Sequence, residues 1–140
     1  MAIHPIDYRY GTPEMRAIWD EENRFLCIVR AEVALAQAEA EHGLIPANAA
    51  AAIERCAGNA TLERSKAIEE KIQHDMMAVV RTIAEVCNEA GNYVHYGATS
   101  NDILDTATAL QLSGALALIE TKLCRLLGVL RERSIDTRAL

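Results

Sequence analysis

The chain has 140 residues, 51% of them hydrophobic, and a formal net charge of −6. This length fits one domain, and the hydrophobic content is enough to build a core, which excludes global disorder. The negative charge argues against nucleic acid and against an anionic membrane surface as partners, although a local pocket can still bind a small anion.

Neither a membrane segment nor a targeting segment is predicted. No apolar run approaches the roughly 20 residues that a membrane-spanning helix needs, and the N-terminus lacks the basic and then apolar order of a signal peptide. The four cysteines lie far apart and never form a C-x-x-C pair, at Cys27, Cys56, Cys87 and Cys124. We interpret them as four small buried thiols in a reducing cytosol rather than as a zinc site, which predicts a cytoplasmic location.

The first half of the chain predicts three helices. Helix-favouring residues dominate and no segment alternates with the two-residue period of a strand, so the predicted fold class is all-α. Thr12 before Pro13 predicts a cap and a short helix that ends near Trp19. Asp20 predicts the cap of a longer helix that ends near His42 and Gly43, with the apolar stripe Leu26, Val29, Val33, Ala36 and Ala40. A short alanine-rich helix follows over residues 47–56.

The next segment predicts one long helix over residues 62–90. Thr61 starts it, Gly91 and Asn92 close it, and its apolar stripe is Ile68, Ile72, Met76, Val79, Ile83 and Val86. His74 should then lie opposite this stripe, as a solvated surface residue or as a group for proton transfer or anion binding. Asp75 flanks the stripe, where an unpaired carboxylate is costly, so we expect it to have a hydrogen-bond donor as partner.

A last helix is predicted from about residue 101 to 134. Its apolar residues step by four and three without a break, forming what we call the heptad stripe: Leu112, Leu116, Ile119, Leu123, Leu126 and Leu130. Such a helix is roughly 50 Å long, and no other predicted segment can cover the stripe. It therefore needs partner chains or further sequence, and we interpret the end at Leu140 as a truncation. The loop near Gly97 is the predicted domain boundary, between residues 1–97 and 98–140.

The stretch ATSND, residues 98–102, has two open interpretations. Thr99 with Asp102 three residues on matches a capping box, with Ser100 and Asn101 as rival caps. The hydroxyls of Thr99 and Ser100, the free backbone N–H groups and the helix dipole can equally form a site for a carboxylate or a phosphate. One capping residue would be enough, and this run exceeds that need.

Two further segments carry residues that suit an anionic substrate. Arg9 lies between Tyr8 and Tyr10, and a guanidinium can donate two parallel hydrogen bonds to a phosphate, although a surface ion pair is the simpler interpretation. Tyr93 and Tyr96 flank His95, so all four tyrosines lie in two short segments. No P-loop, dinucleotide-binding fingerprint or H-E-x-x-H helix is present, and nothing calls for a metal or an organic cofactor.

Taken together, these segments resemble the adenylosuccinate lyases of the fumarase/aspartase superfamily. The matching stretches are RYGTPEMRAIWDEENRF at 9–25, HDMMAVVR at 74–81 and VHYGATSNDILDTA at 94–107. The third stretch alone is also similar to the 3-carboxymuconate cycloisomerases, and the Arg-Tyr…Pro-Glu-Met opening favours the lyases. The resemblance implies a helical N-terminal domain followed by the first long helix of a helical bundle.

The resemblance also implies a reaction. The family eliminates fumarate from adenylosuccinate to give AMP, and from the succinyl-carboxamide ribotide SAICAR to give AICAR, in purine synthesis and without a cofactor. By resemblance, Thr99 and Ser100 hold a succinyl carboxylate, while Arg9 and Tyr10 take the nucleotide phosphate. Gln73, His74 and Asp75 line the substrate pocket, His74 assists catalysis, and His95 lies close by. Gln73 stands where many relatives carry arginine, so the charge expected there is absent.

The family's proton donor and its serine base are expected beyond Leu140. Family members are homotetramers whose active sites combine residues from three subunits. We therefore expect this chain to be inactive alone. Two alternatives stay open from the sequence: a 3-carboxymuconate cycloisomerase-type enzyme, and a non-catalytic helical oligomerisation module in which the polar loop residues are only caps.

Overall fold

The computed structural model describes residues 9–138, so Tyr8 lies outside the described part of the chain. Within this range every regular element is helical, which confirms the all-α class. The α-helices are α2 (Pro13–Trp19), α3 (Glu21–Glu41), α4 (Ala47–Cys56), α5 (Leu62–Ile72), α6 (Asp75–Cys87) and α7 (Ser100–Asp136). Two 3₁₀ helices, η1 (Ala57–Asn59) and η2 (Asn88–Tyr93), connect them.

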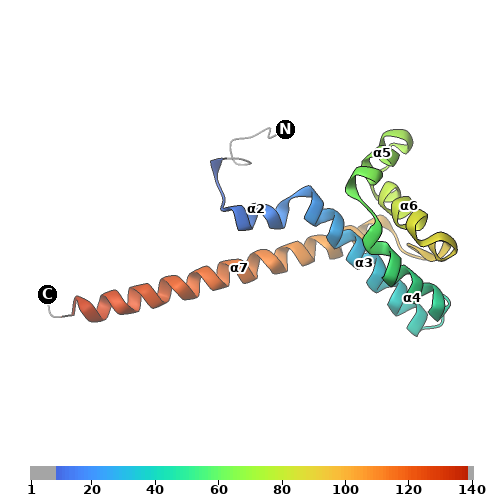
Figure 1. Cartoon of the computed structure of the whole chain (residues 1–140). Coiled ribbons are helices and arrows are strands. Elements are labelled where there is room, and N and C mark those ends of the chain that lie inside the picture. Colours follow the sequence, from blue (N-terminus) through green and yellow to red (C-terminus); the bar gives the residue numbers. More distant parts are fainter. Residues whose placement is uncertain (1–8, 139–140) are drawn as a thin grey trace.

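The helices form a compact cluster from which one helix projects. Figure 1 shows α3 to α6 gathered around the start of α7, with α2 lying along the middle of α7 and the rest of α7 extending away. Within the described residues, no helix has both the length and the apolar character needed to cross a bilayer. The domain boundary near Gly97 stays a prediction.

Three helix starts follow directly from local sequence. The Thr12 hydroxyl accepts a hydrogen bond from the Met15 N–H at 3.4 Å, ahead of Pro13. The Asp20 carboxylate accepts from the N–H three residues on at 2.7 Å, and Thr61 does the same at 3.2 Å. Each cap satisfies an N–H group that has no partner within its helix, which confirms the predicted starts of α2, α3 and α5.

The core joins α3, α4, α6 and the first turns of α7, with Phe25, Ile28, Ala36, Ile53, Met76, Val79, Ile83, Ile103 and Ala107 among its buried residues. The predicted stripe of α3 is partly wrong, because Leu26 is 44% exposed while Phe25 is 2% exposed. The buried face is rotated by one residue and includes Glu32 and Glu39. A stripe chosen for apolar residues alone misses it.

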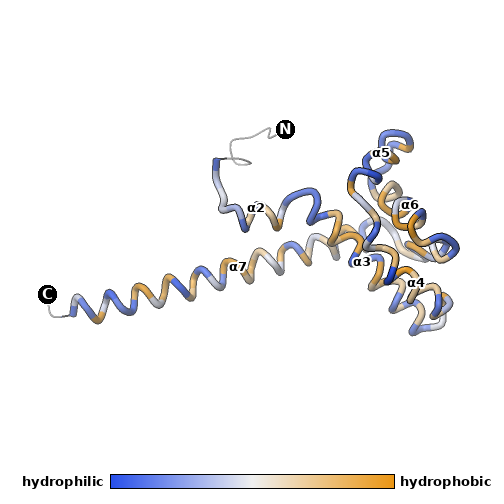
Figure 2. The backbone as a smooth tube through the Cα atoms, viewed as in Figure 1, coloured by the Kyte–Doolittle hydropathy of each residue, from blue (hydrophilic) through white to orange (hydrophobic). Residues whose placement is uncertain are grey.

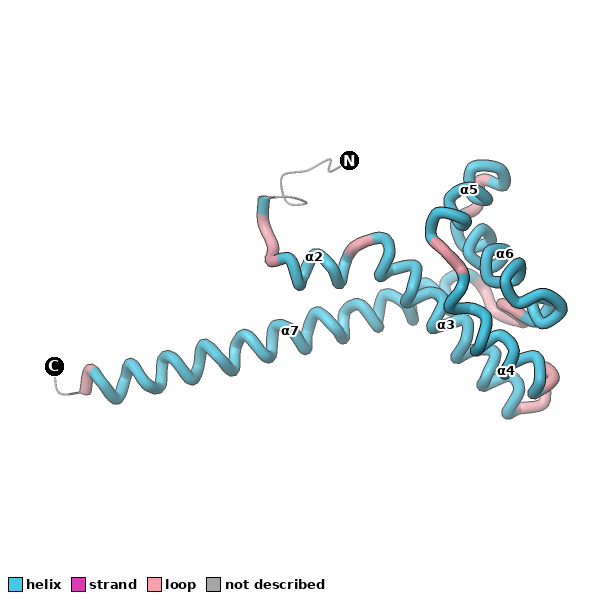
Figure 3. The backbone as a smooth tube through the Cα atoms, viewed as in Figure 1, coloured by secondary structure: helices cyan, strands magenta, loops and turns pink. Residues whose placement is uncertain are grey.

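The single helix predicted over 62–90 is wrong. The helix is interrupted at Gln73, which has a left-handed φ of 54°. His74 then caps α6, because its Nδ1 accepts a hydrogen bond from the Met77 N–H at 3.3 Å. Figure 3 shows the short loop between α5 and α6. Helix α6 also ends at Cys87, and the residues up to Tyr93 form η2. The apolar period continues across the break because α5 and α6 both face one core, so periodicity could not reveal it.

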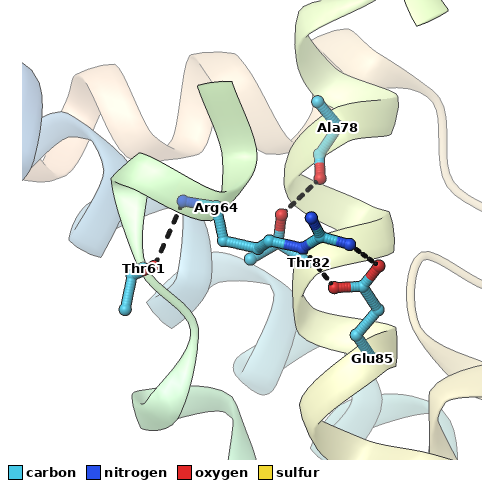
Figure 4. A network of polar contacts seen from close by, with 5 residues as sticks. All are labelled: Thr61, Arg64, Ala78, Thr82 and Glu85. Carbon is cyan, nitrogen blue, oxygen red and sulfur yellow. Dashed lines mark hydrogen bonds and ion pairs between the residues drawn. The ribbon is translucent and has the colours of Figure 1, made fainter. Parts of the chain in front are cut away.

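A bidentate ion pair joins the two helices on either side of this break. Arg64 Nε and Nη2 each donate to a different carboxylate oxygen of Glu85 at 2.7 Å, and Figure 4 shows the two side chains facing each other from α5 and α6. The Arg64 guanidinium lowers the pKa of Glu85 through these hydrogen bonds. Both side chains are about half exposed, so the pair orients the helices more than it stabilises them.

Gly91 in η2 is required by a close backbone approach. A Cβ atom at this position would lie 2.5 Å from the Ala84 carbonyl oxygen, so one of the two helices would have to move. We expect Gly91→Ala to lower the free energy of unfolding by about 2 kcal/mol or more. Gly58→Ala, in η1, is the matched control because its Cβ meets nothing within 4 Å. Equal urea midpoints for the two variants would contradict the prediction.

The heptad stripe of α7 is uncovered, as the sequence predicts. Its six residues are between 44% (Ile119) and 63% (Leu116) exposed. Figure 2 shows apolar residues recurring along α7 as far as its C-terminal part, well beyond the α3–α6 cluster. Leu112, Leu116 and Leu123 line an apolar groove on this surface. The chain thus presents a long apolar face with nothing from its described residues packed on it.

Candidate functional site

The N-terminal end of α7 carries the most specific part of the candidate site. The Thr99 N–H donates to Asp102 Oδ2 at 2.9 Å, and the two residues form the predicted capping box. This arrangement leaves the N–H groups of Ser100 and Asn101 without a partner among the described residues. Thr99 is exposed and Ser100 is half-buried. The cap and the anion site are therefore compatible, since free N–H groups and hydroxyls remain at the positive end of a 37-residue helix.

His95, which had no assigned role, has a specific partner. Its Nδ1 lies 2.7 Å from Glu32 Oε1, and the histidine and glutamate side chains are 12% and 0% exposed. The residue adopts a left-handed φ of 63°, a conformation that costs a non-glycine residue on the order of 1–2 kcal/mol. Glu32 belongs to α3, 63 residues earlier in the chain. The role of Glu32 could not be predicted from the sequence, because a glutamate between apolar positions of a helix is normally expected to be solvated.

Two carboxylates are buried beneath the loop that leads into α7. Glu32 and Glu39 lie seven residues apart on one face of α3, and each has one oxygen, Oε2, that is buried without a hydrogen-bond partner. No other described side chain has such an atom. Burial raises the pKa of Glu32, against the opposing effect of His95. Burial likewise raises the pKa of Glu39.

Removing the buried charge of Glu39 should stabilise the protein. We expect Glu39→Met to raise the free energy of unfolding at neutral pH by about 1–3 kcal/mol, because the apolar side chain leaves no unsatisfied carboxylate. The pKa of Glu39 is higher in the folded state, so as the pH falls the folded wild type takes up a proton before the unfolded chain does. The stability advantage of the variant should therefore shrink toward pH 4.5, the ordinary value for the group.

The measurement is urea unfolding at several pH values. Glu54→Met is the matched control, because it removes an exposed glutamate of α4 and should change stability by no more than about 0.5 kcal/mol. An advantage of Glu39→Met that is independent of pH would contradict the assignment.

Gln73, His74 and Asp75 lie at the junction of α5 and α6. Asp75 is exposed, contrary to the expectation that it flanks a buried stripe, because α6 begins at this residue instead of continuing α5. The donor predicted for it is the Met76 N–H at 2.7 Å, and His74 Nδ1 lies 3.7 Å from the same carboxylate. Gln73 donates from Nε2 to the Glu70 carbonyl oxygen at 2.9 Å. All three side chains are therefore accessible.

A cleft of about 230 Å³ connects this junction to α7. Asp75 and Met76 line it together with Leu104, which lies one turn into α7. Two cationic residues, Arg24 and Lys66, and two further carboxylates, Glu21 and Glu69, also line the cleft, and Lys66 is ion-paired with Glu21. The cleft thus places Asp75 of the His-Asp segment within reach of the helix whose first turn holds Thr99 and Ser100. Within residues 9–138 no group of three His, Cys, Asp or Glu side chains could hold a metal ion.

Arg9 and Tyr10 are separated from these groups in one chain. Gln111 Nε2 donates to the Ile18 carbonyl oxygen at 2.7 Å and Lys122 Nζ lies 3.7 Å from Glu14, so α2 runs antiparallel to α7. Lys122 follows Ser100 by 22 residues, which is about 33 Å along the helix. The five residues from Arg9 to Glu14 span at most about 17 Å.

The Arg9 guanidinium instead lies 5.7 Å from the ring centre of the neighbouring Tyr10. A single copy of the chain therefore cannot bring Arg9 to the start of α7. The candidate site residues therefore form two groups, one around α6 and the start of α7 and one at the start of α2.

Comparison with known proteins assigns the family. The model of the lyase family matches residues 7–139. This chain belongs to the lyase family. It is 50% identical over 137 residues to the adenylosuccinate lyase of Methanocaldococcus jannaschii, covering 96% of this chain and 30% of that protein. It is 41% identical over 126 residues to the N-acetyl-S-(2-succino)cysteine lyase of Dickeya dadantii, with 85% and 28% covered.

A similar solved structure supports the helical arrangement. The crystal structure of the 3-carboxy-cis,cis-muconate lactonizing enzyme from Pseudomonas putida superposes with a TM-score of 0.82 at 34% identity, covering 94% of this chain and 31% of that one. This lyase-family chain spans about 30% of the length of the curated relatives that it matches. The roles of the individual site residues remain predictions.

Proposed function

We propose that this chain is the N-terminal part of an adenylosuccinate lyase, which eliminates fumarate from adenylosuccinate to give AMP and from SAICAR to give AICAR. The observation that carries the proposal is the start of α7, where Thr99 and Ser100 offer hydroxyls beside unpaired N–H groups. The 50% identity to the M. jannaschii adenylosuccinate lyase supports this substrate class. The reaction belongs to purine nucleotide synthesis and, as proposed, takes place in the cytoplasm without a cofactor.

The proposed reaction makes two demands on the protein. A base removes a proton from the carbon next to a carboxylate, the C–N bond breaks, and an acid protonates the departing amine nitrogen, which leaves fumarate with its new double bond. The carboxylates must be held by positive groups or hydrogen-bond donors while charge builds up next to them. In this chain, Thr99 and Ser100 are proposed to hold a carboxylate of the substrate. His74 is proposed to assist proton transfer, and Gln73, Asp75 and His95 to line the pocket.

We further propose that the complete site forms between subunits of a homo-oligomer, a tetramer. The separation of Arg9 and Tyr10 from Thr99 supports this arrangement, because their phosphate-binding role requires another copy of the chain. The uncovered heptad stripe supports it as well, since an apolar face of this length is typical of a helix that packs in a bundle. The proposed main acid and base lie outside residues 1–140.

The test is fumarate release, followed by absorbance, from the purified 140-residue chain and from the full-length protein that contains it. We expect release from adenylosuccinate and SAICAR by the full-length protein, and none above background by the 140-residue chain. Release by the 140-residue chain would contradict the proposed division of the site.

The same assay separates the alternatives when other substrates are offered. Preferential turnover of N-acetyl-S-(2-succino)cysteine, the substrate class in the name of the Dickeya dadantii relative, would replace adenylosuccinate. Turnover of 3-carboxymuconate would favour the cycloisomerase alternative, which the Pseudomonas putida structure raises. No turnover of any of these by a folded full-length protein would favour the oligomerisation module.

A further inference from the structure

The loop before α7 is attached to α3 by His95 and by little else that is polar. Val94 is buried on one side of His95, and on the other a Cβ at Gly97 would lie 3.9 Å from Glu39 Oε1. The 2.7 Å contact from His95 Nδ1 to Glu32 is the hydrogen bond that joins the loop to the buried carboxylates. A left-handed conformation at a histidine persists only where surrounding contacts hold it, and such positions concentrate at functional sites.

The two ring nitrogens of His95 have different environments. Nδ1 faces the fully buried Glu32 side chain. Nε2 makes no hydrogen bond with a described residue, yet it is not among the buried atoms that lack a partner, so it is accessible from solvent. In a neutral imidazole one nitrogen carries the proton and the other accepts, and a carboxylate next to Nδ1 selects the Nδ1–H form. Nε2 is then the nitrogen that can meet a ligand.

We propose that Glu32 is a positioning residue: its carboxylate accepts the Nδ1–H of His95 and so fixes the tautomer and the orientation of the ring, leaving Nε2 to exchange a hydrogen bond or a proton with the substrate. His95 precedes Thr99 by only four residues, so the ring belongs to the same end of α7 as the proposed carboxylate site. The step at the substrate rests on the proposed function, whereas the tautomer is a property of the chain itself.

The first test reads the tautomer directly in the 140-residue chain. Histidine ¹⁵N shifts are recorded at a pH where the rings are neutral, and His95→Gln identifies the signals of His95 among those of the four histidines. We expect the proton of His95 on Nδ1. A proton on Nε2 would overturn the proposal, because Glu32 would then be the donor in the contact.

Two matched variants separate positioning from burial. Glu32→Met removes the acceptor and should convert His95 to a mixture of tautomers or to the Nε2–H form. Glu39→Met removes the other buried carboxylate of α3, which has no hydrogen bond to His95, and should leave the Nδ1–H form unchanged. An unchanged tautomer in Glu32→Met, or the same change in both variants, would overturn the proposal.

The second test measures fumarate release by the full-length protein. Loss of one charge-assisted hydrogen bond to the ring predicts a fall in kcat of roughly 10- to 100-fold in Glu32→Met, with a smaller change in KM. Unchanged kcat in a variant whose tautomer has changed would overturn the role of Glu32 at the site. If the wild type releases no fumarate while His95 carries Nδ1–H, the proposed function fails and the positioning by Glu32 stands. If the wild type releases fumarate while His95 carries its proton on Nε2, the proposed function stands and Glu32 has no positioning role.

Discussion

Thr99→Ala combined with Ser100→Ala is expected to lower the rate of fumarate release by the full-length protein roughly 100- to 1,000-fold, the cost of losing preorganised donors at a site of developing charge. The stability cost should be only about 1 kcal/mol, as for the loss of other helix caps. The effect on stability should be small because only Thr99 belongs to the capping box. The effect on rate should be large because both hydroxyls are proposed to bind the substrate carboxylate.

Thr61→Ala is the matched control for this double variant. Thr61 caps α5 with the same side-chain chemistry, accepting the Arg64 N–H at 3.2 Å, and has been assigned no part in the site. It should lose about the same stability, about 1 kcal/mol, with turnover close to that of the wild type. Both variants are measured by urea unfolding and by fumarate absorbance. Unchanged turnover in a folded Thr99→Ala, Ser100→Ala protein would show that these residues only cap the helix and do not bind the substrate.

Leu116→Glu combined with Leu123→Glu is expected to abolish self-association of the chain through α7. These two residues of the heptad stripe are 63% and 53% exposed in the single chain. Burial of one leucine stabilises an interface by about 1.5–3 kcal/mol, so losing two weakens association at least about 100-fold, before the cost of burying two carboxylates is added. Sedimentation velocity should find monomers where the wild type forms larger species.

A control with the same added charge uses the polar side of α7. Thr121 and Gly128 are exposed, are one heptad apart like the two leucines, and lie on the side of the helix away from Leu123. Thr121→Glu combined with Gly128→Glu should leave the sedimentation coefficient unchanged. In the full-length protein the leucine variant should also lose turnover, because the proposed site draws on residues of more than one copy. Equal dissociation in the two variants would show that net charge, not the heptad stripe, controls assembly.

The sequence by itself determined the features whose physical causes act within a few residues. A helix cap is a contact between a side chain and an N–H group three residues on, so Thr12, Asp20, Thr61 and the Thr99–Asp102 box could be predicted from their spacing alone. The heptad stripe of α7 is likewise a property of one segment. Its exposure could also be predicted, because no other predicted segment is long enough to cover it.

The tertiary structure decided the rest, because burial and polar partnership depend on residues that are distant in the sequence. The break at Gln73 could not be predicted because α5 and α6 share one apolar period. The exposure of Asp75 could not be predicted either, because it follows from that break. Glu32 and His95 are 63 residues apart, and neither predicts the other until α3 and the loop before α7 pack together. The distance from Arg9 to Thr99 follows only from the antiparallel packing of α2 on α7, since local spacing carries no information about how far apart two helix ends lie.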